Sequence, residues 1–288
     1  KYPTADGENA RAKIDLALAF IEAYKDDDLI TPGFGPHAPH TVNAEDLKLI
    51  SALSEQYDLP VSMHVAETEK EFLEFEDKYG LTPIEYLDSI GMLNERFIAA
   101  HAIFVTDSDI ALMKERDIGV SHNMVANIKS AKGLSPALQM HDLGLRVGLG
   151  TDGPMSGNTL DIIGQMGYVA KLHKLDNNDR TVMPPIKVVE MATIGGARAI
   201  HRENELGSIE TGKLADVVVV EVQSANMVPI YNPYSALVYS ANASNVATVI
   251  VNGKVIVKNK VLQTYDETKS RQMMIEFSDR VRAISKTL

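Results

Sequence analysis

Short apolar runs followed by a polar or charged residue recur through the first half of this chain, and they restrict its fold more than any other feature. Helical segments separate these runs, and strands that alternate with helices are typical of βα units around a parallel sheet. Because the carboxyl ends of parallel strands meet at one edge, the residues that follow the runs are expected to share a site. The expected strands are Leu29–Phe34, Pro60–His64, Phe97–His101, Ile118–His122 and Arg146–Thr151.

Helix starts lie between the expected strands and carry local markers. Thr68-Glu69-Lys70-Glu71 is a capping-box pattern, and Thr82-Pro83-Ile84-Glu85 adds proline at the first helical position. Ser135-Pro136 marks a third start, and Ala10–Tyr24 is predicted to be an amphipathic helix before the first strand. These segments make the chain an α/β protein.

The pattern changes at Gly207, where βα units give way to β-structure. We therefore expect two units, an α/β unit over residues 1–206 and a small β unit with a closing helix over residues 207–288. A chain of 288 residues, 45% of them hydrophobic, can bury a core of this size. The second unit is predicted to contain strands at Val217–Val222 and Val246–Val257, a turn at Asn252-Gly253, and a helix over Thr268–Ile284.

Composition excludes several classes of partner. The net charge is −11 and no cluster of Lys or Arg interrupts it, so binding of nucleic acid or of an anionic membrane is not expected. There is no cysteine, so any metal must be held by histidine and carboxylate. We find no signal-peptide pattern and no apolar run that could cross a bilayer, and we expect a cytoplasmic protein acting on a small molecule.

The candidate site residues follow the expected strands. Zinc takes imidazole and carboxylate ligands and keeps one position open for water in catalytic sites, so His64 and Asp152 are the candidate ligands. His101 could orient the water, and Glu67 could carry protons. An aspartate in Gly-Thr-Asp-Gly also suits a simple turn, and His122 suits a structural role.

Five motifs follow one another along the chain: Gly33-Phe34-Gly35-Pro36-His37, His64-Val65-Ala66-Glu67, Ala100-His101, Ser121-His122-Asn123 and Gly150-Thr151-Asp152-Gly153. Their order resembles the amidohydrolase superfamily, and within it the branch of 5-methylthioadenosine/S-adenosylhomocysteine deaminases. The resemblance covers nearly the whole chain. It implies a metal-dependent hydrolase with a (β/α)8 TIM barrel and a small β-sandwich, to which the stretch from Gly207 to Asp216 would lead.

The resemblance also implies a role for each matching residue. His64 would be the metal ligand of the fifth strand, Glu67 the proton shuttle, His101 the sixth-strand histidine beside the reacting water, and Asp152 the eighth-strand ligand and base. The implied cofactor is one divalent ion, with zinc as first choice and iron or manganese as ions that accept similar ligands.

His37 and Ser156 match positions that line the substrate pocket in such deaminases. The implied reaction is attack of water on C6 of an adenine nucleoside, protonation of N1 by Glu67 and loss of ammonia, which leaves an inosine-type product. 5-Methylthioadenosine, S-adenosylhomocysteine and adenosine are all candidate substrates. A homodimer is the general expectation for such an enzyme.

One departure from the family is large. Its first strand carries a His-x-His pair that supplies two metal ligands, and no His-x-His occurs in this sequence. The five expected strands would be the fourth to the eighth of the barrel, and the chain starts at Lys1 without an initiator methionine. We therefore expect an amino-terminal part, with the His pair and the opening half of the β-sandwich, to be missing.

Other functions stay open at this point. Guanine or cytosine deaminases and triazine hydrolases of the same superfamily share the metal site and differ mainly in the pocket. A non-catalytic oligomeric scaffold is an alternative of another class. A phosphate-binding barrel is disfavoured, because no Gly-rich loop opens a helix after a late strand.

Overall fold

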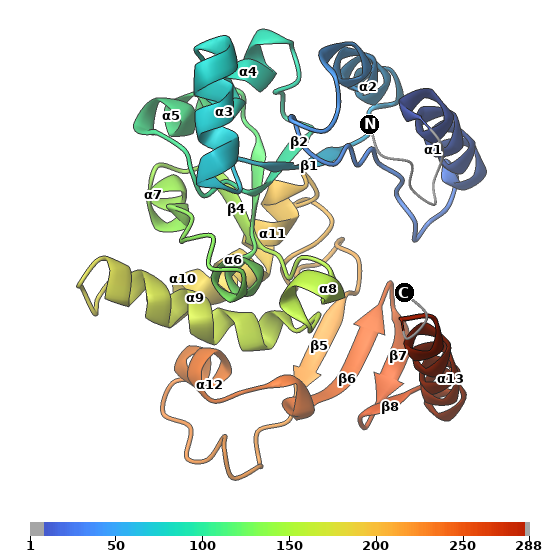
Figure 1. Ribbon diagram of the computed structural model, residues 1–288. Helices are drawn as coiled ribbons and strands as arrows, with labels where there is room; N and C mark the ends of the chain where they lie inside the picture. The colour runs from blue at the N-terminus through green and yellow to red at the C-terminus, as the bar shows by residue number, and fades with distance from the viewer. Residues whose placement is uncertain (1–8, 286–288) are drawn as a thin grey trace.

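The structure is a computed structural model that describes residues 9–285. The expectations that concern the start of the chain at Lys1 lie outside the described residues. The described chain contains two four-stranded sheets, one parallel and one antiparallel. Helices surround the parallel sheet, whereas the antiparallel sheet lies beside a single long helix near the carboxyl terminus (Figure 1).

The parallel sheet has the strand order β1-β2-β3-β4. Its register pairs Val65 with His101 and His122 with Leu149, so the carboxyl ends of the strands lie level with one another. Side chains on these strands are largely buried, as expected for a sheet covered on both faces. The strands are β1 (Val61–Val65), β2 (Phe97–His101), β3 (Gly119–His122) and β4 (Arg146–Leu149).

The expected strand at Leu29–Phe34 is wrong. Only Phe34 pairs with the sheet, through an isolated parallel bridge to Val61. Pro32 removes one backbone donor from this segment, and Leu29 is 66% exposed, so neither a hydrogen-bond ladder nor burial favours a longer strand. The described residues thus hold four parallel strands in an open sheet rather than five, and the expected (β/α)8 barrel is not closed by them.

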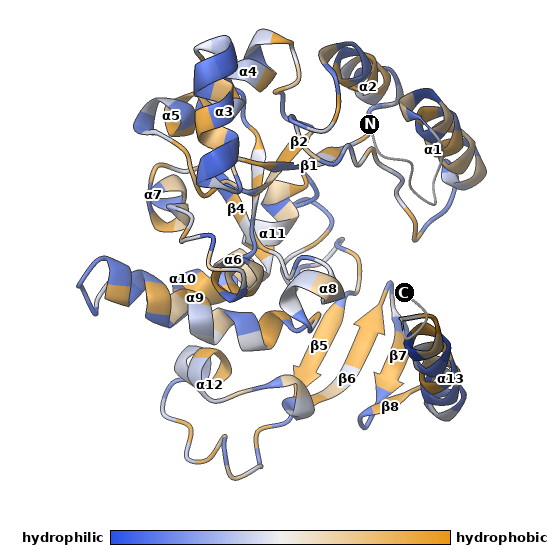
Figure 2. Cartoon of the chain, viewed as in Figure 1, coloured by the Kyte–Doolittle hydropathy of each residue, from blue (hydrophilic) through white to orange (hydrophobic). Residues whose placement is uncertain are grey.

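Helices connect the strands and cover the sheet, and their apolar faces turn toward it (Figure 2). The amino-terminal helix occupies Ala10–Tyr24 as predicted, with Ile14 and Ile21 buried. The helices around the parallel sheet are α1 (Ala10–Tyr24), α2 (Ala44–Tyr57), α3 (Glu69–Tyr79), α4 (Pro83–Ser89), α5 (Asp107–Glu115), α6 (Met124–Lys129), α7 (Ala137–Asp142), α8 (Pro154–Gly157), α9 (Ile162–Asp176), α10 (Pro185–Ala192) and α11 (Ile194–Ala199).

The three predicted helix starts behave differently. Thr82 and Glu85 form a complete capping box at α4. At α3, Thr68 caps the backbone of Glu71, but the Glu71 carboxylate reaches back past Thr68 to earlier residues. The Ser135 hydroxyl does not cap α7, because it donates to the carbonyl of Ala102 at 2.8 Å. Local sequence marks where these helices begin, but tertiary contacts decide what the side chains bind.

The antiparallel sheet has the order β5-β6-β7-β8 and contains the predicted hairpin. Asn252 and Gly253 both have positive φ, 45° and 74°, as a two-residue hairpin turn requires. The described residues form a single β layer here. The elements are β5 (Val217–Val220), α12 (Pro233–Tyr239), η1 (Ala243–Asn245), β6 (Val246–Val251), β7 (Lys254–Lys258), β8 (Val261–Leu262) and α13 (Glu267–Ser285). Within residues 9–285, no helix has the length and apolarity that a membrane span needs.

Candidate active site

Three strand ends of the parallel sheet carry the predicted site residues inward. Backbone φ is positive just after β1 at Ala66 (50°), at the end of β2 at His101 (76°), and after β4 at Asp152 (60°). Residues other than glycine rarely adopt this conformation, which costs roughly 1–3 kcal/mol and is concentrated at functional sites. The chain thus bends sharply at the three places where a histidine or carboxylate enters the site.

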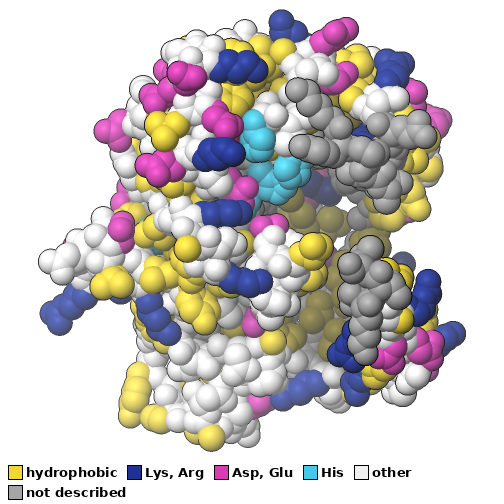
Figure 3. Space-filling model, in the orientation of Figure 1, with side chains coloured by type: hydrophobic (Ala, Val, Ile, Leu, Met, Phe, Trp, Pro, Cys, Tyr) yellow, Lys and Arg dark blue, Asp and Glu magenta, His cyan; other side chains and the backbone are white. Residues whose placement is uncertain are grey.

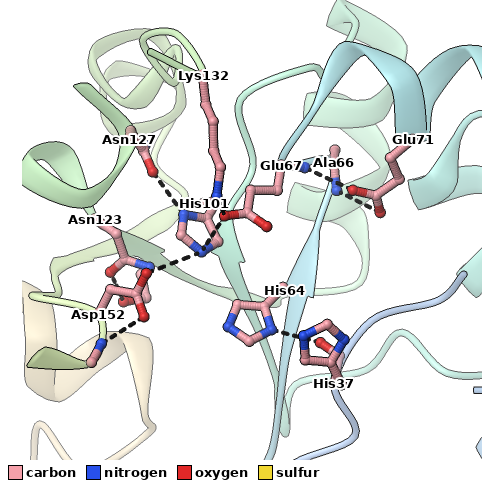
Figure 4. A network of polar contacts seen from close by, with 12 residues as sticks. His37, His64, Ala66, Glu67, Glu71, His101, Asn123, Asn127, Lys132 and Asp152 are labelled. Atoms are coloured by element: carbon pink, nitrogen blue, oxygen red, sulfur yellow. Dashed lines mark hydrogen bonds and ion pairs between the residues drawn. The ribbon is translucent and has the colours of Figure 1, made fainter. Parts of the chain in front are cut away.

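The imidazoles of three predicted residues lie next to one another. The ring centroids of His37 and His64 are 5.0 Å apart, and those of His64 and His101 are 5.4 Å apart with the rings nearly parallel. Figure 3 shows histidine side chains gathered at one place on the surface, and Figure 4 shows Glu67 and Asp152 beside them. The structure therefore brings together five of the six predicted site residues.

His64 is oriented by a backbone carbonyl. Its Nδ1 lies 2.7 Å from the carbonyl oxygen of His37. Because a carbonyl only accepts, Nδ1 must carry the proton, and this leaves the lone pair on Nε2. Metal-binding histidines are commonly held in this way by a carbonyl or carboxylate on the other ring nitrogen. The geometry of His64 fits the ligand role predicted for it.

His101 is almost completely buried and is oriented by a residue that the sequence did not single out. Its Nδ1 lies 2.7 Å from Oδ1 of Asn127 in α6. Nε2 faces Oε1 of Glu67 at 3.4 Å and Oδ2 of Asp152 at 3.9 Å, and within the described chain it has no hydrogen-bond partner. Burial lowers the pKa of His101, which favours the neutral ring. With Nδ1 donating to Asn127, Nε2 presents a lone pair to the site.

Glu67 is held from two sides. Its backbone N–H donates to the Glu71 carboxylate at 3.0 Å, and the N–H of Ala66 donates to the same carboxylate at 3.2 Å. Its own carboxylate accepts a hydrogen bond from the ammonium group of Lys132. Burial acts to raise the pKa of Glu67, but the contact with the Lys132 ammonium outweighs it and lowers the pKa. Glu67 is therefore ionised and able to accept a proton.

Asp152 has one oxygen for the turn and one for the site. Oδ1 accepts a hydrogen bond from the backbone N–H of Gly153 at 2.6 Å, so Asp152 also stabilises the turn, as the sequence allowed. Oδ2 faces His101.

Ser156 lies four residues after Asp152, in α8, and no hydrogen bond in the described part of the chain joins its side chain to the cluster. The pocket role of Ser156 is untested.

His122 belongs to a different contact. Its Nε2 lies 3.2 Å from Nε2 of His173 in α9, and both rings are buried. Burial lowers the pKa of His122 to about 3 and that of His173 to about 4, so both rings are neutral near pH 7. This pair supports the packing of α9 against the sheet and leaves His122 outside the cluster.

Within residues 9–285, no group of three or more His, Asp or Glu side chains is arranged to hold a metal ion. The two predicted ligands are therefore at most a partial set. A separate cavity of about 770 Å³ lies between the start of α1 and the aromatic residues of α3 and α4, and its lining includes His40 but none of the clustered residues. We place the candidate site at the cluster rather than at this cavity, because the imidazoles and carboxylates predicted from the sequence lie together there.

Three residues that sequence reasoning missed support the cluster: Glu71, Asn127 and Lys132. Glu71 occupied a visible capping-box position, so a signal existed, but it indicated a helix start rather than support for the site. Asn127 and Lys132 follow the Ser121-His122-Asn123 motif closely, yet nothing local indicates that their side chains reach His101 and Glu67.

Comparisons with known proteins find related deaminases. A 5-methylthioadenosine/S-adenosylhomocysteine deaminase of Thermodesulfovibrio yellowstonii is 38% identical over 98% of this chain and 64% of its own length. A 5'-deoxyadenosine deaminase of Methanothermobacter thermautotrophicus is 41% identical over 84% of this chain and 56% of its own length. The chain thus spans less than two thirds of either relative.

Solved structures show the same fold. An adenosine deaminase from Xanthomonas campestris with bound zinc superposes with a TM-score of 0.95 at 33% identity, over 98% of this chain and 64% of that one. Atrazine chlorohydrolase from Arthrobacter aurescens, complexed with zinc, gives a TM-score of 0.86 at 22% identity, over 93% of this chain and 60% of its own, and shows the fold alone. The model of the amidohydrolase family matches residues 2–256. The chain belongs to the amidohydrolase family.

Proposed function

We propose that this protein is a metal-dependent hydrolytic deaminase of adenine nucleosides, with 5-methylthioadenosine or S-adenosylhomocysteine as substrate. One observation carries the proposal: the ionised Glu67 carboxylate and the free Nε2 of a neutral His101 meet at the ends of adjacent parallel strands, beside Asp152. A proton acceptor next to an oriented imidazole suits proton transfer from water to a ring nitrogen. The related deaminases support the choice of an adenine nucleoside.

The proposed architecture extends beyond the described strands. Residues 1–206 would form the later part of a (β/α)8 barrel, and residues 207–288 one layer of a small β-sandwich with the closing helix. The remaining strands, with a His-x-His pair, would belong to a part of the protein outside this sequence. The open edge of the parallel sheet and the shorter span relative to the related proteins support this arrangement.

The metal proposed for the site is zinc. His64 through Nε2 and Asp152 through Oδ2 would hold it, and both atoms lack hydrogen-bond partners in the described chain. A divalent ion there would act as a Lewis acid and lower the pKa of water toward neutrality. Zinc in the related adenosine deaminase structure supports this choice.

The chain's own residues would divide the proton transfers. Water adds to C6 of the adenine ring, and Glu67 takes one proton from it and delivers that proton to N1. The lone pair on Nε2 of His101 accepts a hydrogen bond from the second O–H of this water and orients it until Asp152 takes that proton. Asp152 takes the second water proton and returns it to the leaving amino group, so that ammonia and an inosine-type product result.

His37 and Ser156 would line the nucleoside pocket. A cytoplasmic homodimer is the proposed setting.

A substrate screen of the full-length, metal-loaded protein tests this function. Ammonia release and the change in purine absorbance should appear with 5-methylthioadenosine, S-adenosylhomocysteine or adenosine, and not with guanine, cytosine or a triazine. If only guanine, cytosine or a triazine is turned over, the proposed substrate class is wrong and the compound that reacts defines the substrate class instead. If no compound releases ammonia and the purified protein holds no metal, the scaffold alternative is favoured.

Variants of Glu67 and Asp152 separate chemistry from metal binding. Glu67→Gln should lower kcat by about 10²–10⁴-fold and keep the metal, because it removes proton transfer and leaves the proposed ligands intact. Asp152→Asn should reduce both metal content and rate. Glu74→Gln is the matched control, since Glu74 lies on the exposed face of α3 beside Lys70. Near-normal activity of Glu67→Gln would remove Glu67 from the mechanism.

A further inference from the structure

The Glu67 side chain needs a partner to stay where it is. Its backbone is fixed by Glu71, but the carboxylate faces Nε2 of His101 at 3.4 Å, and within the described chain this nitrogen makes no hydrogen bond. His101 therefore does not hold the carboxylate in place. Without a further contact, the carboxylate would be free to rotate away from the imidazole toward solvent.

The ammonium group of Lys132 makes the side-chain contact that opposes this rotation. It donates to Oε1 of Glu67, the same oxygen that faces His101. The Lys132 side chain is 31% exposed and that of Glu67 is 21% exposed, so the pair is better shielded from solvent than an ordinary surface ion pair. In Figure 4, Lys132 extends along one side of His101 and ends at the Glu67 carboxylate.

The backbone conformation around Lys132 fixes the direction of this side chain. Ala131 and Gly133 have positive φ, 53° and 126°, on either side of it. The N–H of Lys132 returns to the carbonyl of Asn127 at 3.0 Å, which closes the turn after α6. A Cβ at position 133 would lie 3.1 Å from Cγ2 of Ile103, so the turn is also packed against the end of β2. Such a turn fixes where Lys132 points.

We propose that Lys132 is the positioning residue for Glu67: its ammonium group holds the carboxylate beside His101 in the substrate-free site. This rests on the proposed function, because it assigns Glu67 the proton transfer. Asn127 at the other end of the same turn orients His101. One short segment, from Asn127 to Lys132, therefore sets the relative placement of the two groups that handle protons.

Kinetics of full-length, metal-loaded variants test the proposal. Lys132→Ala should lower kcat by about 10–100-fold and change KM by less than about 3-fold, because misplacement of a reacting group acts on the chemical step. Lys132→Arg keeps a cation and should lose less. Added ethylammonium should restore part of the rate to Lys132→Ala, which loss of fold alone would not permit. Lys114→Ala is the matched control, since Lys114 is exposed on α5 and, among residues 9–285, its ammonium group donates only to the carbonyl of Gly144.

A second readout does not depend on turnover. The NMR resonance of the Glu67 carboxyl carbon is measured in protein made with ¹³C-labelled glutamate, and it is assigned by its loss in Glu67→Gln. The chemical shift of this resonance should change in Lys132→Ala and stay the same in Lys114→Ala. An unchanged resonance, or full kcat in Lys132→Ala, overturns the role of Lys132. Failure of the wild-type protein to deaminate any nucleoside overturns the proposed function instead, and the carboxyl resonance still decides whether Lys132 positions Glu67.

Discussion

The parallel and antiparallel sheets have similar apolar strands but opposite environments. Val120 in β3 is completely buried, whereas Val218 in β5 is 54% exposed. Within the described chain, none of the residues of β5 to β8 is buried. The difference shows that apolar residues can form a strand in either sheet, whereas burial of that strand depends on the elements that pack against it. Among the residues that the structure describes, the parallel sheet alone has a buried core on its faces, and this sheet carries the candidate site.

Two glycines should show the largest contrast between the sheets. A Cβ on Gly119 in β3 would lie 2.0 Å from the backbone carbonyl oxygen of Ala199 in α11, which has no room to move. Gly119→Ala should therefore cost about 4 kcal/mol or more of unfolding free energy, or prevent folding. Gly253→Ala in the β6–β7 turn meets nothing within 4 Å and only strains a φ of 74°, at a cost of about 1 kcal/mol.

Denaturant unfolding of both variants measures this contrast. Equal losses would mean that the antiparallel sheet is packed as tightly in solution as the parallel one. Gly253→Ala also serves as the control for the loss of glycine flexibility itself, since both substitutions add the same methyl group.

The parallel sheet could be predicted well from the sequence because strands, helices and caps are marked by residues close together in the chain. Strand, helix and cap signals placed β1 to β4 and the capping box at Thr82 within a few residues. The strand at Leu29–Phe34 failed because its partner, Val61, pairs with only one of its residues. Burial of the antiparallel sheet could not be judged from its own residues, because it depends on what packs against them.

The candidate site shows the same limit. Positions 37, 64, 67, 101 and 152 were predicted because each follows an apolar run or belongs to a motif. Lys132 contacts Glu67 across 65 positions of sequence, and Asn127 contacts His101 across 26. No short pattern records such pairs. Residues that support a site from a neighbouring βα connection therefore become visible only with the fold.

Acid should destabilise the parallel unit through the buried pair His122 and His173. Their folded pKa values, about 3 and about 4, lie below the ordinary 6.5, so the unfolded chain binds protons first as pH falls. Stability is complete above pH 6.5 and is lost as pH falls from there toward 4 and 3. At pH 5 the loss should be about 2 kcal/mol per histidine, or about 4 kcal/mol for the pair.

Unfolding free energies of the wild type and of His173→Gln, measured between pH 7 and pH 5, check this. The variant should lose about 2 kcal/mol less over that range, and the difference cancels the contributions of other buried histidines such as His101. Residues 207–288 contain no histidine, so amide exchange in β5 to β8 should respond less to the same acid step. The same pH dependence in both proteins would contradict the prediction.

A matched pair of valines gives the smallest contrast and the most direct reading of the two sheets. Val120→Ala removes two buried methyl groups between β2 and β4 and should cost about 2 kcal/mol, while Val218→Ala on an exposed strand should cost less than about 0.5 kcal/mol. Both are measured by denaturant unfolding of the 288-residue chain, and then of the full-length protein, in which the proposed second layer should raise the cost of Val218→Ala. If Val218→Ala costs as much as Val120→Ala, something outside the described residues covers the antiparallel sheet, as the proposed sandwich requires. If it costs little, the valines of β5 face solvent in the folded protein, and the second layer of the sandwich does not form there.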